Sequence, residues 1–376
     1  MNIQKFKHLV ILFLISFLYA GCQTIPKTHP EERCPQIIGF HTVTVGHIPI
    51  VLSWSYDSKQ IIYGVHNSQF NTDLFLANLE QNEVLPLKNV NDRLTNVLSA
   101  NFSPRTNEVL IENEDEGVHT IFMIRDNPFS NPQVVGQGRS PQWDPNGNKI
   151  SYYDNLAWNV VDVKDGNQVS MTFEDSVYWW FSYEGFWHPD GNRILMLKNG
   201  ARENLPDDLA ILNLSTSEVT SLTNSNDCER AAQWSPNGDA VAFLGTTAGN
   251  LDIFLMDLDS YEQENLTHSF PQQETEFDWS PDGKKISFIA LDSTDYETQN
   301  KELYLLDIET KQIEQLTFTE EANEINPVWS PDGTKIAYFV QKNSLNDEKL
   351  YQSFELIALD VNDNKSHLIS TIEIDH

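Results

Sequence analysis

Short runs of apolar residues, separated by turn residues, follow one another along most of the chain. The clearest example begins at Trp329, which is followed by the turn Ser-Pro-Asp-Gly and then by the apolar run 335–340. Pro331 presets φ for the first turn position, and Gly333 accepts the positive φ that closes a short hairpin loop. The pattern therefore predicts a strand, a tight turn and a second strand.

Two further runs follow each predicted hairpin. The third run is apolar, as in residues 252–257 and 302–307, whereas the fourth alternates polar and apolar positions, as in residues 218–223 and 313–317. Alternation of this kind is typical of a half-exposed outer strand. Each unit thus predicts four short strands, which make one propeller blade.

The aromatic residue that opens the unit recurs at intervals of 41 to 50 residues, a period typical of propeller blades. The first two copies lack the turn glycine, as terminal repeats often diverge. We therefore predict an all-β fold, a single β-propeller of four-stranded blades with seven blades; six blades after an irregular N-terminal segment is the alternative. The seven copies begin at Trp54, Phe102, Trp143, Trp187, Trp234, Trp279 and Trp329.

Residues 328–338 resemble the repeat of TolB-type propellers, which are relatives of the WD-repeat family. The resemblance covers the chain from about residue 40 to the end, and it implies that residues 36–376 form one propeller domain. Repeats of this family occur in binding proteins, lipoproteins, gating domains of peptidases and a few lyases. The resemblance therefore implies a fold without implying one activity.

Two segments compete for the outermost strand of the last blade. One is residues 41–45, and the other is the C-terminal run 365–374. If residues 41–45 insert beside residues 354–361, the N-terminal segment clasps the last blade and removes an exposed sheet edge. We favour this clasp as the way in which the ring closes.

The beginning of the chain predicts export. Lys5 and Lys7 precede an apolar stretch over residues 9–20, which is shorter than the ~20 residues that a bilayer-spanning helix needs. Residues 1–21 are therefore expected to be a signal peptide rather than a membrane span.

Residues 18–22 resemble a bacterial lipoprotein processing site, which implies that Cys22 carries the lipid and becomes the mature N-terminus. Tyr19 departs from the usual leucine, so ordinary cleavage after Ala20 is the alternative. Residues 22–35 contain three prolines and are expected to be a lipidated, extended tether. The resemblance implies an exported protein anchored to the bacterial outer membrane, facing either the periplasm or the cell surface.

Cysteine use leaves one question open. Besides Cys22 the chain has only Cys34 and Cys228. A disulfide between them and two free thiols are both consistent with the sequence, because spacing alone does not place the two Cα atoms within bonding range.

The charge of the chain and its missing motifs narrow the function classes. With 55 acidic and 24 basic residues, the net charge of −31 makes nucleic acid a poor partner and favours a self-repelling, monomeric protein. The chain has no Gly-x-Ser-x-Gly elbow, no phosphate-binding glycine loop and no dinucleotide fingerprint. These patterns argue against serine hydrolases and nucleotide enzymes.

Three glutamates stand five residues before the repeat tryptophan in successive units. Glu229, Glu274 and Glu324 are therefore expected at equivalent positions around one mouth of the ring, as an acidic rim. Such a rim suits Ca²⁺, which prefers several oxygen ligands, or a basic peptide segment. The alternative is that each glutamate bonds to the neighbouring blade and holds the blades together. No other cofactor is expected, and no metal-ligand spacing of His and Cys is present.

The segment 178–187 is unusually aromatic, with seven aromatic residues among its ten. It is expected to cross the face of the ring between the third and fourth units, where Tyr178, Trp179 and Trp180 stack on a sugar or grip a peptide. The alternative is that the segment folds inward and fills the channel or a seam between blades.

These observations favour a non-enzymatic cell-envelope lipoprotein whose propeller face binds a protein partner. The alternative is a glycan-binding or glycan-processing surface protein, similar to lyases built on related propellers. The histidines do not group as the resemblance to those lyases would require, so no residue is assigned as catalytic. Whether the chain catalyses any reaction stays open.

Overall fold

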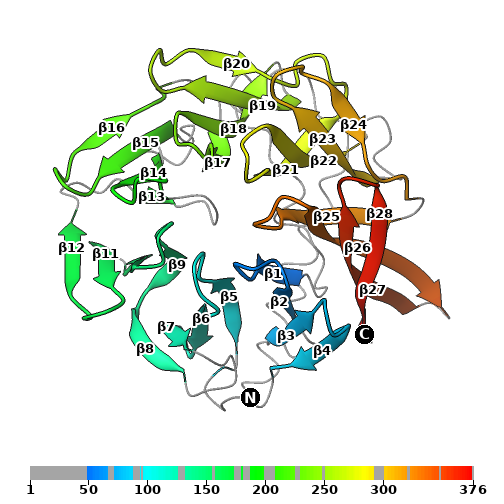
Figure 1. Ribbon diagram of the computed structural model, residues 1–376, viewed down its shortest axis with the longest axis horizontal. Coiled ribbons are helices and arrows are strands. Elements are labelled where there is room, and N and C mark those ends of the chain that lie inside the picture. The colour runs from blue at the N-terminus through cyan, green and yellow to red at the C-terminus, as the bar shows by residue number, and fades with distance from the viewer. Residues whose placement is uncertain are drawn as a thin grey trace, which may run out of the picture.

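The described elements of the computed structural model are all β-strands, arranged in sheets around a ring (Figure 1). No described segment forms a helix able to cross a membrane. Residues 1–21, the tether 22–35 and residues 41–45 lie outside the described part of the chain. The structure describes residues 49–66, 72–87, 94, 96–125, 132–154, 157–172, 179–180, 187–198, 208–224, 229–247, 250–291, 300–319, 322–346 and 349–374.

The first five sequence repeats each form one four-stranded antiparallel sheet, with its strands in chain order. The predicted unit of four short strands is therefore confirmed for these repeats. The strands are β1 (Pro49–Trp54), β2 (Gln60–His66), β3 (Thr72–Asn78), β4 (Glu83–Pro86), β5 (Val97–Phe102), β6 (Val109–Asp115), β7 (Val118–Ile124), β8 (Gln133–Gln137), β9 (Arg139–Trp143), β10 (Lys149–Tyr153), β11 (Ala157–Asp162), β12 (Gln168–Thr172), β13 (Trp179–Trp180), β14 (Arg193–Lys198), β15 (Asp208–Asn213), β16 (Val219–Ser221), β17 (Glu229–Trp234), β18 (Ala240–Thr247), β19 (Asn250–Asp257) and β20 (Gln263–Asn265).

The sixth and seventh repeats share one eight-stranded sheet. A single parallel pair, Lys301 with Asn323, joins the strands of the two repeats. The described residues thus form five separate blades and a sixth, larger sheet. Its strands are β21 (Gln273–Trp279), β22 (Lys285–Leu291), β23 (Lys301–Asp307), β24 (Ile313–Gln315), β25 (Ala322–Trp329), β26 (Lys335–Asn346), β27 (Lys349–Asp360) and β28 (Lys365–Ile374).

The hairpin turn after Trp329 forms as its residue types predict. The Ser330 N–H donates to the Lys335 carbonyl at 2.8 Å, and the Gly333 N–H donates to the Ser330 carbonyl at 2.9 Å. Gly333 has φ of 70°, a conformation that costs a residue with a Cβ more than it costs glycine. The Ser330 hydroxyl donates to Asp332 at 2.7 Å, so the turn residues also satisfy one another.

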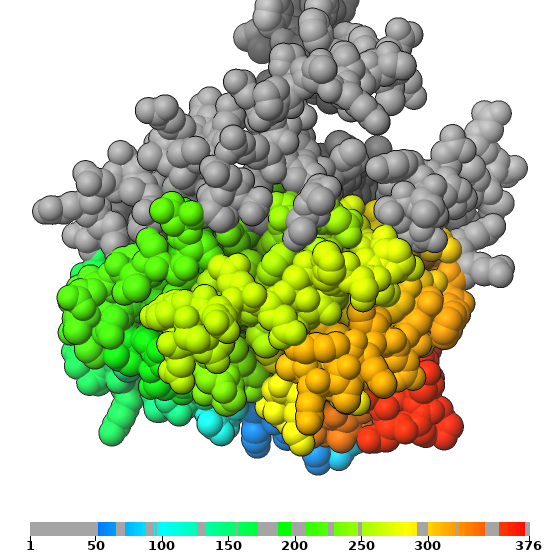
Figure 2. All heavy atoms as spheres, turned by 90° about the horizontal axis from the view of Figure 1, so that it is seen from above, coloured from blue at the N-terminus to red at the C-terminus, as the bar shows by residue number. Residues whose placement is uncertain are grey.

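The first and last repeats pack together and close the ring. The indole N–H of Trp54, in the first repeat, donates to the Val328 carbonyl in the last repeat at 3.0 Å. Tyr63 and Phe339 meet edge to face in the core that the two repeats share. In Figure 2 the yellow, orange and red atoms of the last two repeats form one continuous packed surface.

The favoured N-terminal clasp is wrong as the source of the outermost strand. Strand β28 occupies that position and pairs along β27, with Ile372 opposite Phe354. The physical reason is loop closure: β28 follows β27 after a four-residue turn, whereas residues 41–45 would have to close a loop around the whole ring.

Removing the indole N–H of Trp54, at the interface between the first and last repeats, should lower the stability of the fold. We expect Trp54→Phe to lower the free energy of unfolding by about 1 kcal/mol, because the Val328 carbonyl loses its donor. Trp279→Phe is the matched control, since the Trp279 indole nitrogen has no hydrogen-bond partner among the described atoms. Chemical denaturation measures both variants, and equal losses would contradict a special role for Trp54.

Candidate functional site

The three glutamates occupy equivalent positions in their repeats. Each stands at or near the beginning of the first strand, and all three therefore lie at the same end of the ring. They pair with the second strand as Glu229 opposite Gly245, Glu274 opposite Ala290 and Glu324 opposite Val340.

Their side chains are buried. The exposed fractions are 4% for Glu229 and 0% for both Glu274 and Glu324. The structure thus supports the equivalent placement that the sequence predicts, but these three side chains do not form a solvent-exposed acidic rim. Asp227 lies outside the described residues.

Glu324 and Glu302 meet at Thr319. The Thr319 hydroxyl donates to Glu324 at 2.8 Å, and the Thr319 N–H donates to Glu302 at 2.8 Å. The Thr317 hydroxyl also donates to Glu302, at 2.6 Å. Burial raises the pKa of Glu324 to about 7, and the negative charge of Glu302 adds to this effect. Burial raises the pKa of Glu302 as well.

Glu274 has a more extreme environment. Neither of its carboxylate oxygens makes a hydrogen bond in the described structure, although the Thr267 hydroxyl is near enough to lower its pKa. Burial raises its pKa to about 8, and the nearby charge of Asp252 acts in the same direction. Asp252 is better satisfied, since Asn265 donates to it at 2.7 Å and Asn250 at 3.2 Å. Glu274 is therefore mostly protonated at neutral pH.

An acidic residue, a threonine and a glutamate recur in the same arrangement at three seams, where a seam is the interface between two consecutive repeats. An acidic residue begins or nearly begins the third strand of one repeat, and the glutamate of the next repeat follows it in the chain. A threonine lies between the two in the chain. Its hydroxyl accepts a hydrogen bond of 2.7 to 2.9 Å from the backbone N–H of the residue after the acidic residue. The acidic residue, threonine and glutamate of each seam are Asp208, Thr223 and Glu229; Asp252, Thr267 and Glu274; and Glu302, Thr317 and Glu324.

Two further carboxylates bond directly across the last of these seams. Glu276 accepts the Asn326 N–H at 2.5 Å, and Asp278 accepts the Trp329 N–H at 2.8 Å. Burial raises the pKa of Glu276, while the positive charge of Lys301 opposes that rise. These contacts hold neighbouring repeats together, but Glu276 and Asp278 make them, not the three glutamates for which such bonds were the alternative.

Trp179 and Trp180, the two residues of the predicted site that the structure describes in the aromatic segment, are placed differently from the sequence expectation. Trp179 and Trp180 form β13 and pair with Lys198 and Leu197, so they are part of an inner strand rather than a loop that crosses the face. Aromatic residues favour strands, which explains the difference. In register, Trp179 stands where the next repeat has Glu229. Tyr178 lies outside the described residues.

Sequence reasoning missed a carboxylate and histidine pair. His119 Nδ1 lies 2.8 Å from a carboxylate oxygen of Glu112, whose other oxygen accepts the Ser140 N–H of the next repeat at 3.0 Å. Glu112 is 4% exposed. A glutamate directly after the apolar run 109–111 was the available signal, since a charge in an inner strand needs a partner.

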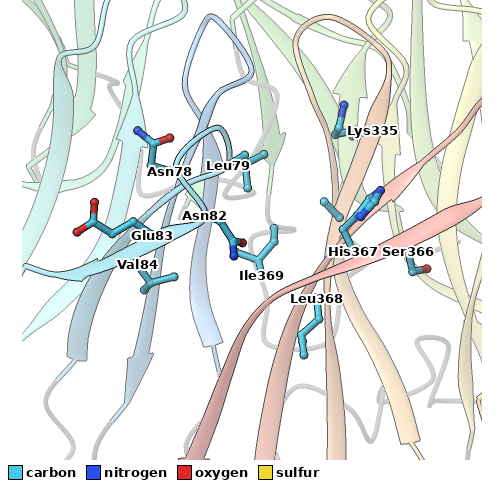
Figure 3. A pocket seen from close by; sticks show the side chains of 11 residues that line it. Asn78, Leu79, Asn82, Glu83, Val84, Lys335, Ser366, His367, Leu368 and Ile369 are labelled. Atoms are coloured by element: carbon cyan, nitrogen blue, oxygen red, sulfur yellow. The ribbon is translucent and has the colours of Figure 1, made fainter.

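A groove of about 460 Å³ lies between the first and last repeats, at the outer edge of the ring (Figure 3). The β3–β4 hairpin contributes Leu79 and Val84, and β28 contributes His367, Leu368 and Ile369. The groove is near the end of the ring that carries the hairpin turns, because it also includes Lys335. It is therefore separate from the buried glutamates.

Comparison with known proteins agrees with the fold. Residues 203–376 match the family described as the TolB beta propeller domain. No curated protein matches the chain in sequence.

Solved structures are similar at low identity. The β-propeller domain of the trilobed protease from Pyrococcus furiosus is 10% identical, with 86% of this chain and 98% of that one covered and a TM-score of 0.62. Puromycin hydrolase is 11% identical with a TM-score of 0.63, and the match covers 87% of this chain but 54% of the hydrolase. TolB from Acinetobacter baumannii is 17% identical over 84% of this chain and 77% of that one, with a TM-score of 0.49. At these identities the structures show the fold alone.

Ca²⁺ can be tested directly as the ligand of the acidic residues. No group of three or more His, Cys, Asp or Glu side chains converges to hold a metal ion in the part of the chain that the structure describes. We expect calorimetric titration with Ca²⁺ at pH 7 to give no binding heat and no rise in Tm, because protons compete for Glu274 and Glu324. Binding heat that Glu324→Gln abolishes would contradict this expectation.

Proposed function

We propose that this TolB-type propeller repeat protein, matched over residues 203–376, is a non-enzymatic envelope protein that binds a protein partner at one end of its ring. The family match is the observation that carries the proposal. The closed ring supports it, because a rigid platform presents docking residues with little loss of conformational entropy.

The end of the ring that carries the buried glutamates is the proposed docking end. Phe318 is 74% exposed there, yet its neighbours Thr317 and Thr319 are bonded to Glu302 and Glu324. An exposed aromatic ring on a fixed backbone is the kind of residue that dominates protein interfaces. Phe318 is therefore the proposed anchor, with Trp179 and Trp180 of β13 at the same end of the ring.

Anchoring and export complete the proposal. Lipid on Cys22 and the tether 22–35 would hold the propeller close to a bacterial membrane, and two or more acyl chains give stable anchoring. The outer membrane is the proposed site.

We also propose that the ring has seven blades. The eight-stranded sheet contains two complete sets of four strands, and among the described residues Lys301–Asn323 is the one strand-pairing position that joins them. Counting each set as one blade gives the seven units of the sequence repeat.

Substitution of Phe318 tests the docking end. Intact lipoprotein is used to capture a partner from its own membranes, and the partner is then purified for affinity measurement. We expect Phe318→Ala to weaken binding about 30-fold, equivalent to ~2 kcal/mol, with unchanged Tm because the ring is exposed. Tyr261→Ala is the control, since Tyr261 is 56% exposed in the β19–β20 turn at the opposite end. Equal effects, or binding to a glycan array without any protein partner, would contradict the proposal.

Substitution of Cys22 tests the anchor. We expect Cys22→Ser to abolish incorporation of labelled palmitate and to move the protein from the membrane fraction to the soluble exported fraction. The control variant Cys34→Ser should leave both palmitate incorporation and membrane fractionation unchanged. Palmitate labelling of the Cys22→Ser variant would contradict lipidation at this residue.

A further inference from the structure

Buried carboxyl groups without adequate partners lie at the two seams that precede the sixth and seventh repeats. Glu274, on β21, is fully buried and neither of its oxygens makes a hydrogen bond among the described atoms; the Thr267 hydroxyl lowers its pKa, whereas the charge of Asp252, on β19 of the preceding repeat, raises it. An ionised carboxylate in such a place has a large desolvation cost that the Thr267 hydroxyl offsets only in part.

The next seam presents a carboxyl pair. Glu302, on β23, and Glu324, on β25, both accept hydrogen bonds from Thr319, and the second oxygen of Glu324 is buried without a partner in the described structure. Tyr338, on β26, also faces this pair, and burial together with the two glutamates raises its pKa to about 12. Two carboxylates joined to one residue repel each other when both are ionised.

We propose that protonated carboxyl groups of Glu274 and Glu324 hold these two seams closed, so that the ring tightens on mild acidification and loosens as the pH rises. A neutral carboxyl group removes the charge from the seam, where water is excluded, and also removes the repulsion from the nearby acidic residue. The stability of the two seams therefore depends on pH.

The direction follows from the two states of the chain. In the folded ring the pKa of Glu274 is about 8 and that of Glu324 about 7, whereas the ordinary value for a glutamate is 4.5. At pH values between 4.5 and the raised pKa, each glutamate is protonated in the folded protein and ionised in the unfolded chain. Stability therefore falls as the pH rises from about 5 to about 8, and this contribution becomes constant above that range.

Other charged groups lie near these seams, and Glu302 is coupled to Glu324 by its charge. Burial raises the pKa of Glu276, and both Lys301 and the Asn326 N–H, which donates to Glu276, oppose that rise. Glu302 keeps hydrogen bonds from Thr317 and Thr319. The difference between wild type and a variant at Glu274 or Glu324 therefore reports that glutamate together with its coupling to Asp252 or Glu302.

Protonation of Glu324 also affects the proposed docking loop, which carries Phe318. The bonds of Thr317 and Thr319 to Glu302 and Glu324 hold the backbone that carries Phe318. Loss of the proton from Glu324 adds repulsion between the Glu324 and Glu302 carboxylates, which Thr319 joins, and this repulsion loosens the loop. This consequence rests on the proposed function, whereas the linkage between pH and stability does not.

The test compares glutamine variants across pH. Glutamine has the shape of the protonated acid but does not ionise, so Glu274→Gln should match wild type near pH 5 and be the more stable protein at pH 8. The ratio of the two unfolding constants should grow about tenfold per pH unit between these values. Glu324→Gln should show the same trend over a narrower range, ending near pH 7. Chemical denaturation at each pH gives the constants.

Controls and outcomes separate the linkage from the docking proposal. Glu264→Gln, at an exposed ion pair with Lys311, should show no growing difference with pH. Losses of stability in Glu274→Gln and Glu324→Gln that are the same at every pH would overturn the proton linkage. If the linkage holds, partner affinity of the wild type should fall between pH 6 and 8 while that of Glu324→Gln stays constant. The linkage without any partner binding would instead count against the proposed function alone.

Discussion

Closure of the ring is the constraint on which the rest of the structure depends. A blade is a sheet with two apolar faces, and each face needs a neighbouring blade, so the first repeat and the last must also become neighbours. The bond from Trp54 to Val328 and the shared core that contains Tyr63 and Phe339 meet this need. Because β28 supplies the outermost strand of the last repeat, these side-chain contacts carry the closure in the described structure.

Exclusion of water from the seams imposes a second condition on the sequence. Every polar group buried there must be hydrogen-bonded, and a charged group that lacks such bonds must become neutral. Glu112 satisfies it with bonds to His119 and to the Ser140 N–H. Glu274 has no such bonds, and its raised pKa shows the other solution, which is to keep the proton. Seams of one ring thus differ in their dependence on pH although their strands are alike.

The repeated turn made much of the fold predictable. Proline and glycine at fixed positions define the hairpin after Trp329, and constant spacing from the tryptophan places Glu229, Glu274 and Glu324 in equivalent register. Prediction failed where long-range packing decides. The clasp by residues 41–45 was wrong, and Trp179 pairs as part of an inner strand. Register does not reveal which side chains a neighbouring repeat will cover, so the acidic rim was expected in solvent and the glutamates are buried.

The sequence by itself determined the repeating unit, since turn chemistry and alternation act between residues that are close in the chain. It also determined the register of the glutamates, because each is counted from its own tryptophan. Only the tertiary structure decided that Glu324 shares Thr319 with Glu302 and that Glu274 has no partner. These outcomes depend on which surfaces meet across a seam, and the desolvation that raises their pKa values exists only once neighbouring repeats exclude water.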